Sequence, residues 1–167
     1  MNHSVFRLLL LATLTCPALA RHGPIESTLK FTEAIACVRV TSVTEDLRQG
    51  IVYQRANLTP IGNSYGMSDH SSIEVEFGIP AKPGTRSFSS DSPYFQIGQR
   101  SIVLLKRDGD RWLVLRQISL SDEGKVEEPE IFRALGFDYG SKASFAVDCL
   151  IAALKKIPKS ESKNLNH

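Results

Sequence analysis

One hairpin signal constrains the fold of this chain more than any other feature. Two apolar runs, Ser101 to Leu105 and Trp112 to Arg116, are joined by Lys106-Arg107-Asp108-Gly109-Asp110-Arg111. Asp108-Gly109 supplies residues that tolerate the positive φ angles of a type I′ turn, which joins antiparallel strands. The sequence therefore predicts a β-hairpin here and a β-rich fold around it.

Three other segments have the composition of strands. Ala34 to Val43 is β-branched and partly alternating, Ile51 to Leu58 has two mixed faces, and Ile73 to Phe77 alternates apolar and acidic residues. Between them, residues 59–72 contain Pro, Gly, Asn and Ser and predict a long loop. Residues 78–93 are rich in Gly, Pro and Ser and predict a second, longer loop.

The chain ends in a pattern typical of an amphipathic helix. From Lys142 to Ile157, apolar residues keep helical spacing, Ser141 can cap the start, and Pro158 stops the helix. Short strands, one hairpin, long loops and a final helix predict a mainly β fold. We expect a small antiparallel barrel, or a sandwich, with the C-terminal α-helix packed on it.

The stretch from Tyr94 to Leu105 makes this expectation more particular. It places an aromatic pair, a β-branched residue, a glycine and polar residues before an apolar strand. Together with Ala36-Cys37-Val38-Arg39-Val40, it resembles small exported OB-like barrels, including netrin-like and metalloproteinase-inhibitor-like domains. Those inhibitors use an N-terminal Cys and many disulfides, which this chain lacks. The resemblance therefore implies a fold and no specific activity.

Residues 1–20 have the pattern of a secretory signal peptide. A polar start with Arg7 precedes the apolar run Leu8 to Leu14, and Ala18-Leu19-Ala20 offers small residues for cleavage after Ala20. The run is shorter than the ~20 apolar residues that span a bilayer. We expect a secreted or periplasmic protein with no membrane span after cleavage. Its parts would be a flexible N-terminus (21–30), a single domain (31–157) and a disordered tail (158–167).

Charge and cysteine content narrow the classes of partner and site. The chain has 20 Lys and Arg against 18 Asp and Glu, a formal net charge of +2, and no basic stripe, so we expect no nucleic acid as partner. Outside residues 1–20 the cysteines are Cys37 and Cys149. In an oxidising compartment such a pair predicts a disulfide between the first strand and the last helix. The alternative is a Cys nucleophile activated by His.

Candidate catalytic groups are few. His70 stands beside hydroxyl and carboxylate groups in Ser68-Asp69-His70-Ser71-Ser72, whereas His22 and His167 lie in the expected flexible ends. A hydrolase using His70 is one hypothesis, but no Gly-x-Ser-x-Gly motif accompanies it. Glu74 and Glu76 would lie on one strand face ~7 Å apart, within the span of paired glycosidase carboxylates. Solvent-facing glutamates explain this pair better.

The remaining candidates are aromatic residues near the Gly/Pro/Ser segment. Phe88, Tyr94 and Phe95 either form a recognition surface or plug one end of the barrel. We find no spacing of metal ligands and expect no cofactor or metal. The sequence favours an exported, non-enzymatic module that binds a protein or glycan of the envelope or extracellular space. The alternatives are the secreted hydrolase using His70 and an inhibitor of a secreted hydrolase.

Overall fold

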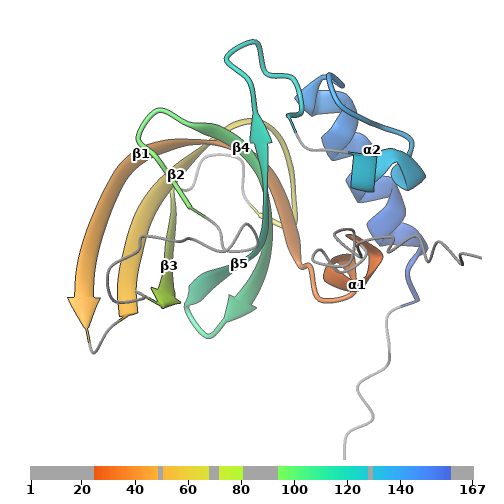
Figure 1. Cartoon of the computed structure of the whole chain (residues 1–167). Coiled ribbons are helices and arrows are strands. Elements are labelled where there is room, and N and C mark those ends of the chain that lie inside the picture. The colour runs from red at the N-terminus through yellow and green to blue at the C-terminus, as the bar shows by residue number, and fades with distance from the viewer. Residues whose placement is uncertain (1–24, 49–50, 68–71, 81–93, 128–129, 159–167) are drawn as a thin grey trace, which may run out of the picture.

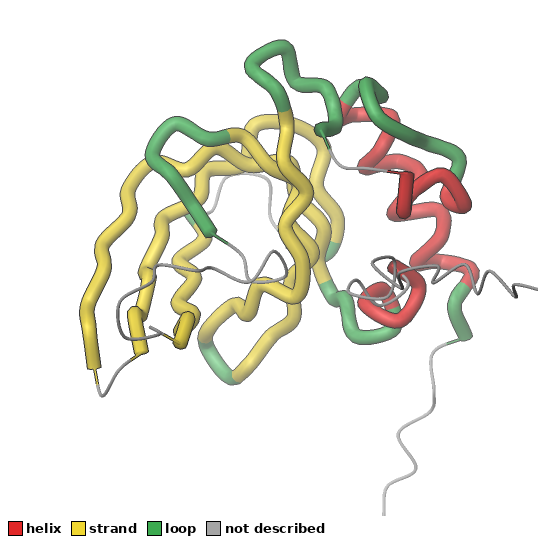
Figure 2. The backbone as a smooth tube through the Cα atoms, viewed as in Figure 1, coloured by secondary structure: helices red, strands yellow, loops and turns green. Residues whose placement is uncertain are grey.

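The computed structural model describes residues 25–48, 51–67, 72–80, 94–127 and 130–158. Within these ranges the chain forms a β-barrel with helices gathered on one side (Figure 1, and red in Figure 2). In chain order the elements are α1 (Ile25–Leu29), β1 (Ala34–Arg48), β2 (Ile51–Tyr65), β3 (Ile73–Pro80), β4 (Arg100–Asp108), β5 (Arg111–Leu120), the 3₁₀ helix η1 (Glu130–Leu135) and α2 (Ala143–Lys156).

The strands close in the order β1-β2-β3-β5-β4, and β4 returns to β1. Neighbouring strands are antiparallel except for β3 and β5, which meet in parallel at Val75 and Trp112. Because β1, β2 and β3 are successively antiparallel, β3 runs in the same direction as β1. β4 runs opposite to β1, and β5 runs opposite to β4, so β5 also runs in the direction of β1 and is parallel to β3. The predicted β-barrel with a C-terminal helix is confirmed, but its sheet is mixed and not wholly antiparallel.

The predicted hairpin is confirmed as β4 and β5, with its turn one residue later than expected. Asp108 pairs with Arg111, so the two connecting residues are Gly109 and Asp110. Gly109 has a φ of 60°, the left-handed region that a tight hairpin turn requires. The dipeptide signal therefore located the hairpin, whereas strand pairing set the register.

β1 and β2 are longer than the sequence indicates. β1 continues to Arg48, and β2 continues to Tyr65 through part of the segment that we expected to be a loop. Pro60 lies inside β2 opposite Val38, where the register of β1 and β2 shifts. Proline lacks an N–H and is tolerated in strands at such irregularities, so it did not end the strand.

Two apolar clusters lie on opposite sides of the barrel wall. One fills the barrel interior and includes Ala36, Val38, Leu58, Val75 and Val103. The other lies outside the wall, between β1, β4 and β5 and the helices; it includes Ile35, Cys37, Ile102, Leu104, Ile118, Phe132, Val147 and Leu150. The first half of β1 is therefore buried on both faces, which explains its nearly continuous apolar sequence.

The helices cover the outer cluster. α2 buries Ala143, Ala146, Val147 and Leu150 against it, as the helical spacing predicts. The Ser141 hydroxyl accepts a hydrogen bond from the Asp138 N–H and does not cap α2. Ile25 and Leu29 of α1 are buried in the same cluster, so these residues are helical and packed, and our expectation of a flexible segment over 21–30 is wrong for 25–29. No helix of the described residues is long and apolar enough to cross a bilayer.

Candidate functional site

Phe95, one of the expected recognition residues, plugs the barrel. Its side chain is 1% exposed and packs in the interior cluster. The side-chain amide of Gln54 on β2 binds both main-chain groups of Phe95: the Phe95 N–H donates to Gln54 Oε1 at 2.9 Å, and Gln54 Nε2 donates to the Phe95 carbonyl at 3.2 Å. Gln54 is itself 1% exposed. Phe95 is therefore a core residue and is not on the surface that a partner meets.

Tyr94 is held in a similar way by β5. Its N–H donates to Gln117 Oε1 at 3.0 Å, and Gln117 Nε2 donates in turn to the hydroxyl of buried Ser101 at 3.1 Å. The Tyr94 side chain is half-buried. Two strand glutamines thus supply the hydrogen bonds that a neighbouring strand would otherwise give to residues 94 and 95.

The turn that follows the plug is joined to β1. The Gly98 N–H donates to the Val40 carbonyl, and the Val40 N–H donates to the Gln99 carbonyl, both at 2.9 Å. Gly98 has a φ of 85°, which allows the chain to reverse here. The reversal leaves Ile97 70% exposed beside β1. Ile97, which the sequence analysis did not single out, is thus a surface apolar residue next to the plug.

Among the residues that the structure describes, one edge of β1 has no sheet partner beyond Val40. β1 pairs with β4 only from Ala34 to Arg39, and past Val40 it pairs with β2 alone within the described residues. In Figure 1 this part of β1 forms the outer border of the sheet. Thr44 to Arg48 are exposed, and Leu47 is 66% exposed. The open edge, as we call residues 41–48 of β1, is a row of main-chain donors and acceptors that another strand can bind.

The register indicates which residues face outward along the open edge. Arg48 and Ile51 are the last paired residues before a two-residue connection. Their main-chain groups therefore face each other, and the alternation of an antiparallel ladder turns the N–H and C=O of Val43, Glu45 and Leu47 toward the open edge. The same alternation puts these three side chains on the face that continues the barrel interior.

Glu45 is the charged residue at the centre of this face. Its Oε1 atom accepts a hydrogen bond of 3.1 Å from Gln54 Nε2, the same nitrogen that binds the Phe95 carbonyl. The plug, the buried amide and the carboxylate therefore form one chain of contacts from the barrel interior to the open edge. A carboxylate accepts hydrogen bonds at both oxygens, so Gln54 leaves Glu45 capacity for a partner.

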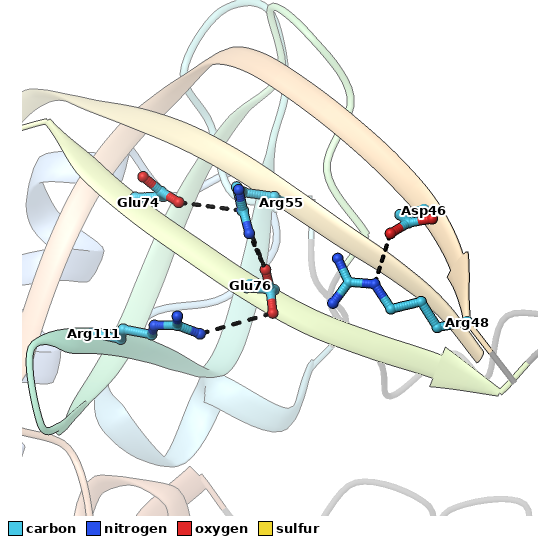
Figure 3. Close-up of polar contacts among 6 residues, drawn as sticks. All are labelled: Asp46, Arg48, Arg55, Glu74, Glu76 and Arg111. Carbon is cyan, nitrogen blue, oxygen red and sulfur yellow. Dashed lines mark hydrogen bonds and ion pairs between the residues drawn. The ribbon is translucent and has the colours of Figure 1, made fainter.

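The two glutamates considered as a glycosidase pair lie on the outer face of β3 (Figure 3). Arg55 of β2 lies between them: its Nε is 3.2 Å from Glu74 Oε1, and its Nη2 is 2.6 Å from Glu76 Oε2. The Arg55 hydrogen bond lowers the pKa of Glu76. A general acid needs a raised pKa, so Glu76 is suited to ion pairing with Arg55 and not to the role of a general acid.

The same outer face carries an ion pair across the parallel seam. Arg111 Nη1 of β5 is 3.9 Å from Glu76 Oε1 of β3 (Figure 3). At the tip of the hairpin between β1 and β2, Arg48 Nε donates to Asp46 Oδ2 at 2.6 Å, and the Arg48 guanidinium lies over the Tyr53 ring. These charges bind one another, and they therefore give the outer face a structural role.

The predicted disulfide is absent, because Cys37 and Cys149 are free thiols in the structure. Both contact the outer cluster, but α2 turns Ala146, Val147 and Leu150 toward it. At about 100° per residue, Cys149 lies roughly 110° around the helix from the centre of that buried stripe. It therefore lies on the flank of α2, whereas Cys37 is buried beneath the helix.

The other candidates fall outside the described residues. These are Phe88, His70 and its neighbours Ser68 to Ser71, and the terminal histidines His22 and His167. Among the residues that the structure does describe, no three His, Cys, Asp or Glu side chains are grouped so as to hold a metal ion. Comparisons with known protein families, with curated proteins and with solved structures find no match to this chain.

Sequence reasoning missed Gln54, Gln117 and the open edge. A glutamine in a mixed strand carries no sign that it will bind a main chain 41 positions away. The open edge was missed because Thr44, Glu45 and Asp46 interrupt the apolar pattern of β1. Polar residues on both faces are, however, a feature of edge strands that have no sheet partner, and this was the available signal.

Proposed function

We propose that this protein is an exported, non-enzymatic binding module with an OB-like barrel, and that it recognises an extended segment of another protein by strand addition to the open edge. The observation that carries the proposal is the length of β1. Its last eight residues extend past the point where β4 leaves it, and within the described residues they pair on one side only. Such an edge binds a peptide main chain directly.

Two features support a protein segment over a glycan. The main-chain N–H and C=O groups that face outward belong to every second residue, Val43, Glu45 and Leu47. A peptide strand presents its own N–H and C=O groups at the same spacing. Exposed apolar side chains stand near both ends of the edge: Ile97 beside Val40, and Leu47 near the hairpin tip. These can anchor the ends of a bound segment, while the main chain of β1 supplies the hydrogen bonds between them.

The closed barrel supports the OB-like assignment, because the OB fold is a five-stranded Greek-key barrel. The export proposal rests on residues 1–20 of the sequence. A secreted or periplasmic location would bring the open edge into contact with envelope or extracellular proteins. The bulge between Val40 and Ser42 and the charges of Glu45 and Asp46 protect the edge against indiscriminate pairing, as in other natural edge strands.

A matched pair of variants at Leu47 tests the proposal. Leu47→Pro removes one outward N–H, whereas Leu47→Ala keeps it and removes only the exposed side chain. Each variant is used as bait in an extract of the native envelope, before and after protease treatment of the extract. We expect one protein to bind the wild type and Leu47→Ala and to be lost with Leu47→Pro and after protease treatment.

Two results would contradict strand addition. Equal retention by Leu47→Pro and the wild type would show that the edge main chain makes no contact. Retention that survives protease treatment would identify a glycan. Arg55→Ala, on the outer face, serves as a control and should bind the partner as the wild type does. Circular dichroism confirms that each variant is folded.

A further inference from the structure

We infer that the segment bound at the open edge carries a basic residue between two apolar residues at alternate positions. This inference rests on the proposed function and specifies the partner's chemistry. Along the edge, Val43, Glu45 and Leu47 share one face and turn their main-chain groups outward. A strand paired with them presents three side chains on that same face, one opposite each of these residues.

The central position of the partner is defined by charge. Glu45 is exposed, and its carboxylate is positioned by Gln54, which is fixed by the Phe95 plug. The neighbouring charges Asp46 and Arg48 are on the opposite face and bind each other. Glu45 is therefore the charge that a partner strand meets on this face, and opposite charges directly across two strands stabilise the pairing.

The flanking positions are defined by the apolar residues. Val43 is half-buried against the interior cluster, and Leu47 is largely exposed. Apolar side chains opposite these two residues would cover them and remove apolar surface from water. The resulting pattern is apolar-x-basic-x-apolar, and it reads the same in both chain directions.

The same geometry argues against a second copy of this chain as the partner. The antiparallel register that sets the three outward residues of the edge against those of a twofold copy pairs Val43 with Leu47 and places Glu45 opposite Glu45. Like charges directly opposite each other destabilise a strand pair. This register therefore disfavours pairing of the edge with itself, whereas a strand with the complementary charge is favoured.

Three synthetic peptides test the inference. They share a Val-Thr-x-Thr-Val core flanked by threonines, and the central residue is Lys, Gln or Glu. Binding to the purified protein is followed by NMR through the amide shifts of Val43, Glu45 and Leu47, up to millimolar peptide. We expect affinity to fall in the order Lys, Gln, Glu, with Lys exceeding Glu about threefold to tenfold and with the difference shrinking at high salt.

Variants at Glu45 test whether its charge, and not the shape of its side chain, causes the preference among the peptides. Glu45→Gln can still accept the hydrogen bond from Gln54 and should remove the preference, whereas Glu45→Lys should reverse it. Equal affinity for all three peptides in the wild type, with binding lost in Leu47→Pro, would overturn this inference and leave strand addition standing. Failure of every peptide to bind, or unchanged binding to Leu47→Pro, would overturn both.

Discussion

Gln54 binds the main chain of Phe95 with both ends of its side-chain amide, at 2.9 and 3.2 Å. Both residues are almost completely buried. The amide takes the place of a neighbouring strand, because it supplies a hydrogen bond to a buried main-chain donor and to a buried main-chain acceptor. By the same contact it places its nitrogen beside Glu45, so the interior of the barrel determines the position of a charge at the open edge.

Gln54→Met should lower the free energy of unfolding by about 2 to 4 kcal/mol. Methionine nearly matches glutamine in volume but can neither accept a hydrogen bond from the Phe95 N–H nor donate one to the Phe95 carbonyl. Urea unfolding measures the change. Gln96→Met, at the exposed position next to Phe95, is the matched control and should have little effect. A Gln54→Met protein as stable as the wild type would show that the amide contact is dispensable.

Phe95→Ala should lower the free energy of unfolding by about 3 to 5 kcal/mol, because it removes a large side chain from a closed interior. Ile97→Ala, two residues away on the surface, should change stability by less than about 0.5 kcal/mol. Tyr94→Ala should fall between these values, since the Tyr94 ring is half-buried. Equal unfolding midpoints for Phe95→Ala and Ile97→Ala would restore Phe95 to the recognition surface.

Glu76 should contribute to the acid sensitivity of the protein. Its pKa is lowered chiefly by the Arg55 hydrogen bond, so its stabilising effect is present above the unfolded-state pKa of about 4.3 and is lost as the pH falls through the lower folded-state value. Glu76→Gln should therefore lose less stability than the wild type between pH 7 and pH 3. Because the group is near the surface, the difference should be small. An equal loss of stability in the wild type and in Glu76→Gln between pH 7 and pH 3 would show that Glu76 does not contribute to the acid sensitivity.

The thiols should react unequally and slowly. Burial raises the pKa of both Cys37 and Cys149, so less thiolate is present at neutral pH than for an ordinary cysteine. In protein that lacks residues 1–20, and with them Cys16, iodoacetamide should modify half-buried Cys149 in the native state, faster at pH 9 than at pH 7, and Cys37 only in denaturant. Cys149→Ser should remain unmodified until it unfolds. Wild-type protein that takes up no label in denaturant without reductant would reveal the disulfide that the structure lacks.

Local signals predicted the parts of the fold that local physics decides. The β4–β5 hairpin followed from a turn dipeptide between apolar runs, and the burial of Ile73 and Val75 followed from strict alternation. The stripe of α2 followed from helical spacing. These features depend on residues close together in the sequence, where the spacing of apolar residues and the chemistry of the turn residues are sufficient to predict the structure.

The remainder depended on contacts between distant residues. The length of β1 is fixed by β2, and not by its own polar second half. Gln54 gains its role only when residue 95 enters the barrel. Cys149 belongs to the apolar face that the sequence predicts for α2, but the residues of α2 that are buried against the barrel are centred on Ala146, Val147 and Leu150. Each is a case in which tertiary pairing overrides the local pattern.

Amide hydrogen exchange along β1 tests the open edge most directly. In the free protein the N–H groups of Val43, Glu45 and Leu47 should exchange rapidly, because they face outward, while those of Thr44 and Asp46 should be protected by β2. Addition of the peptide with the central lysine should protect Val43, Glu45 and Leu47 and leave the other two unchanged. Uniform protection of all five amides in the free protein would show that the edge is already paired and would contradict the account.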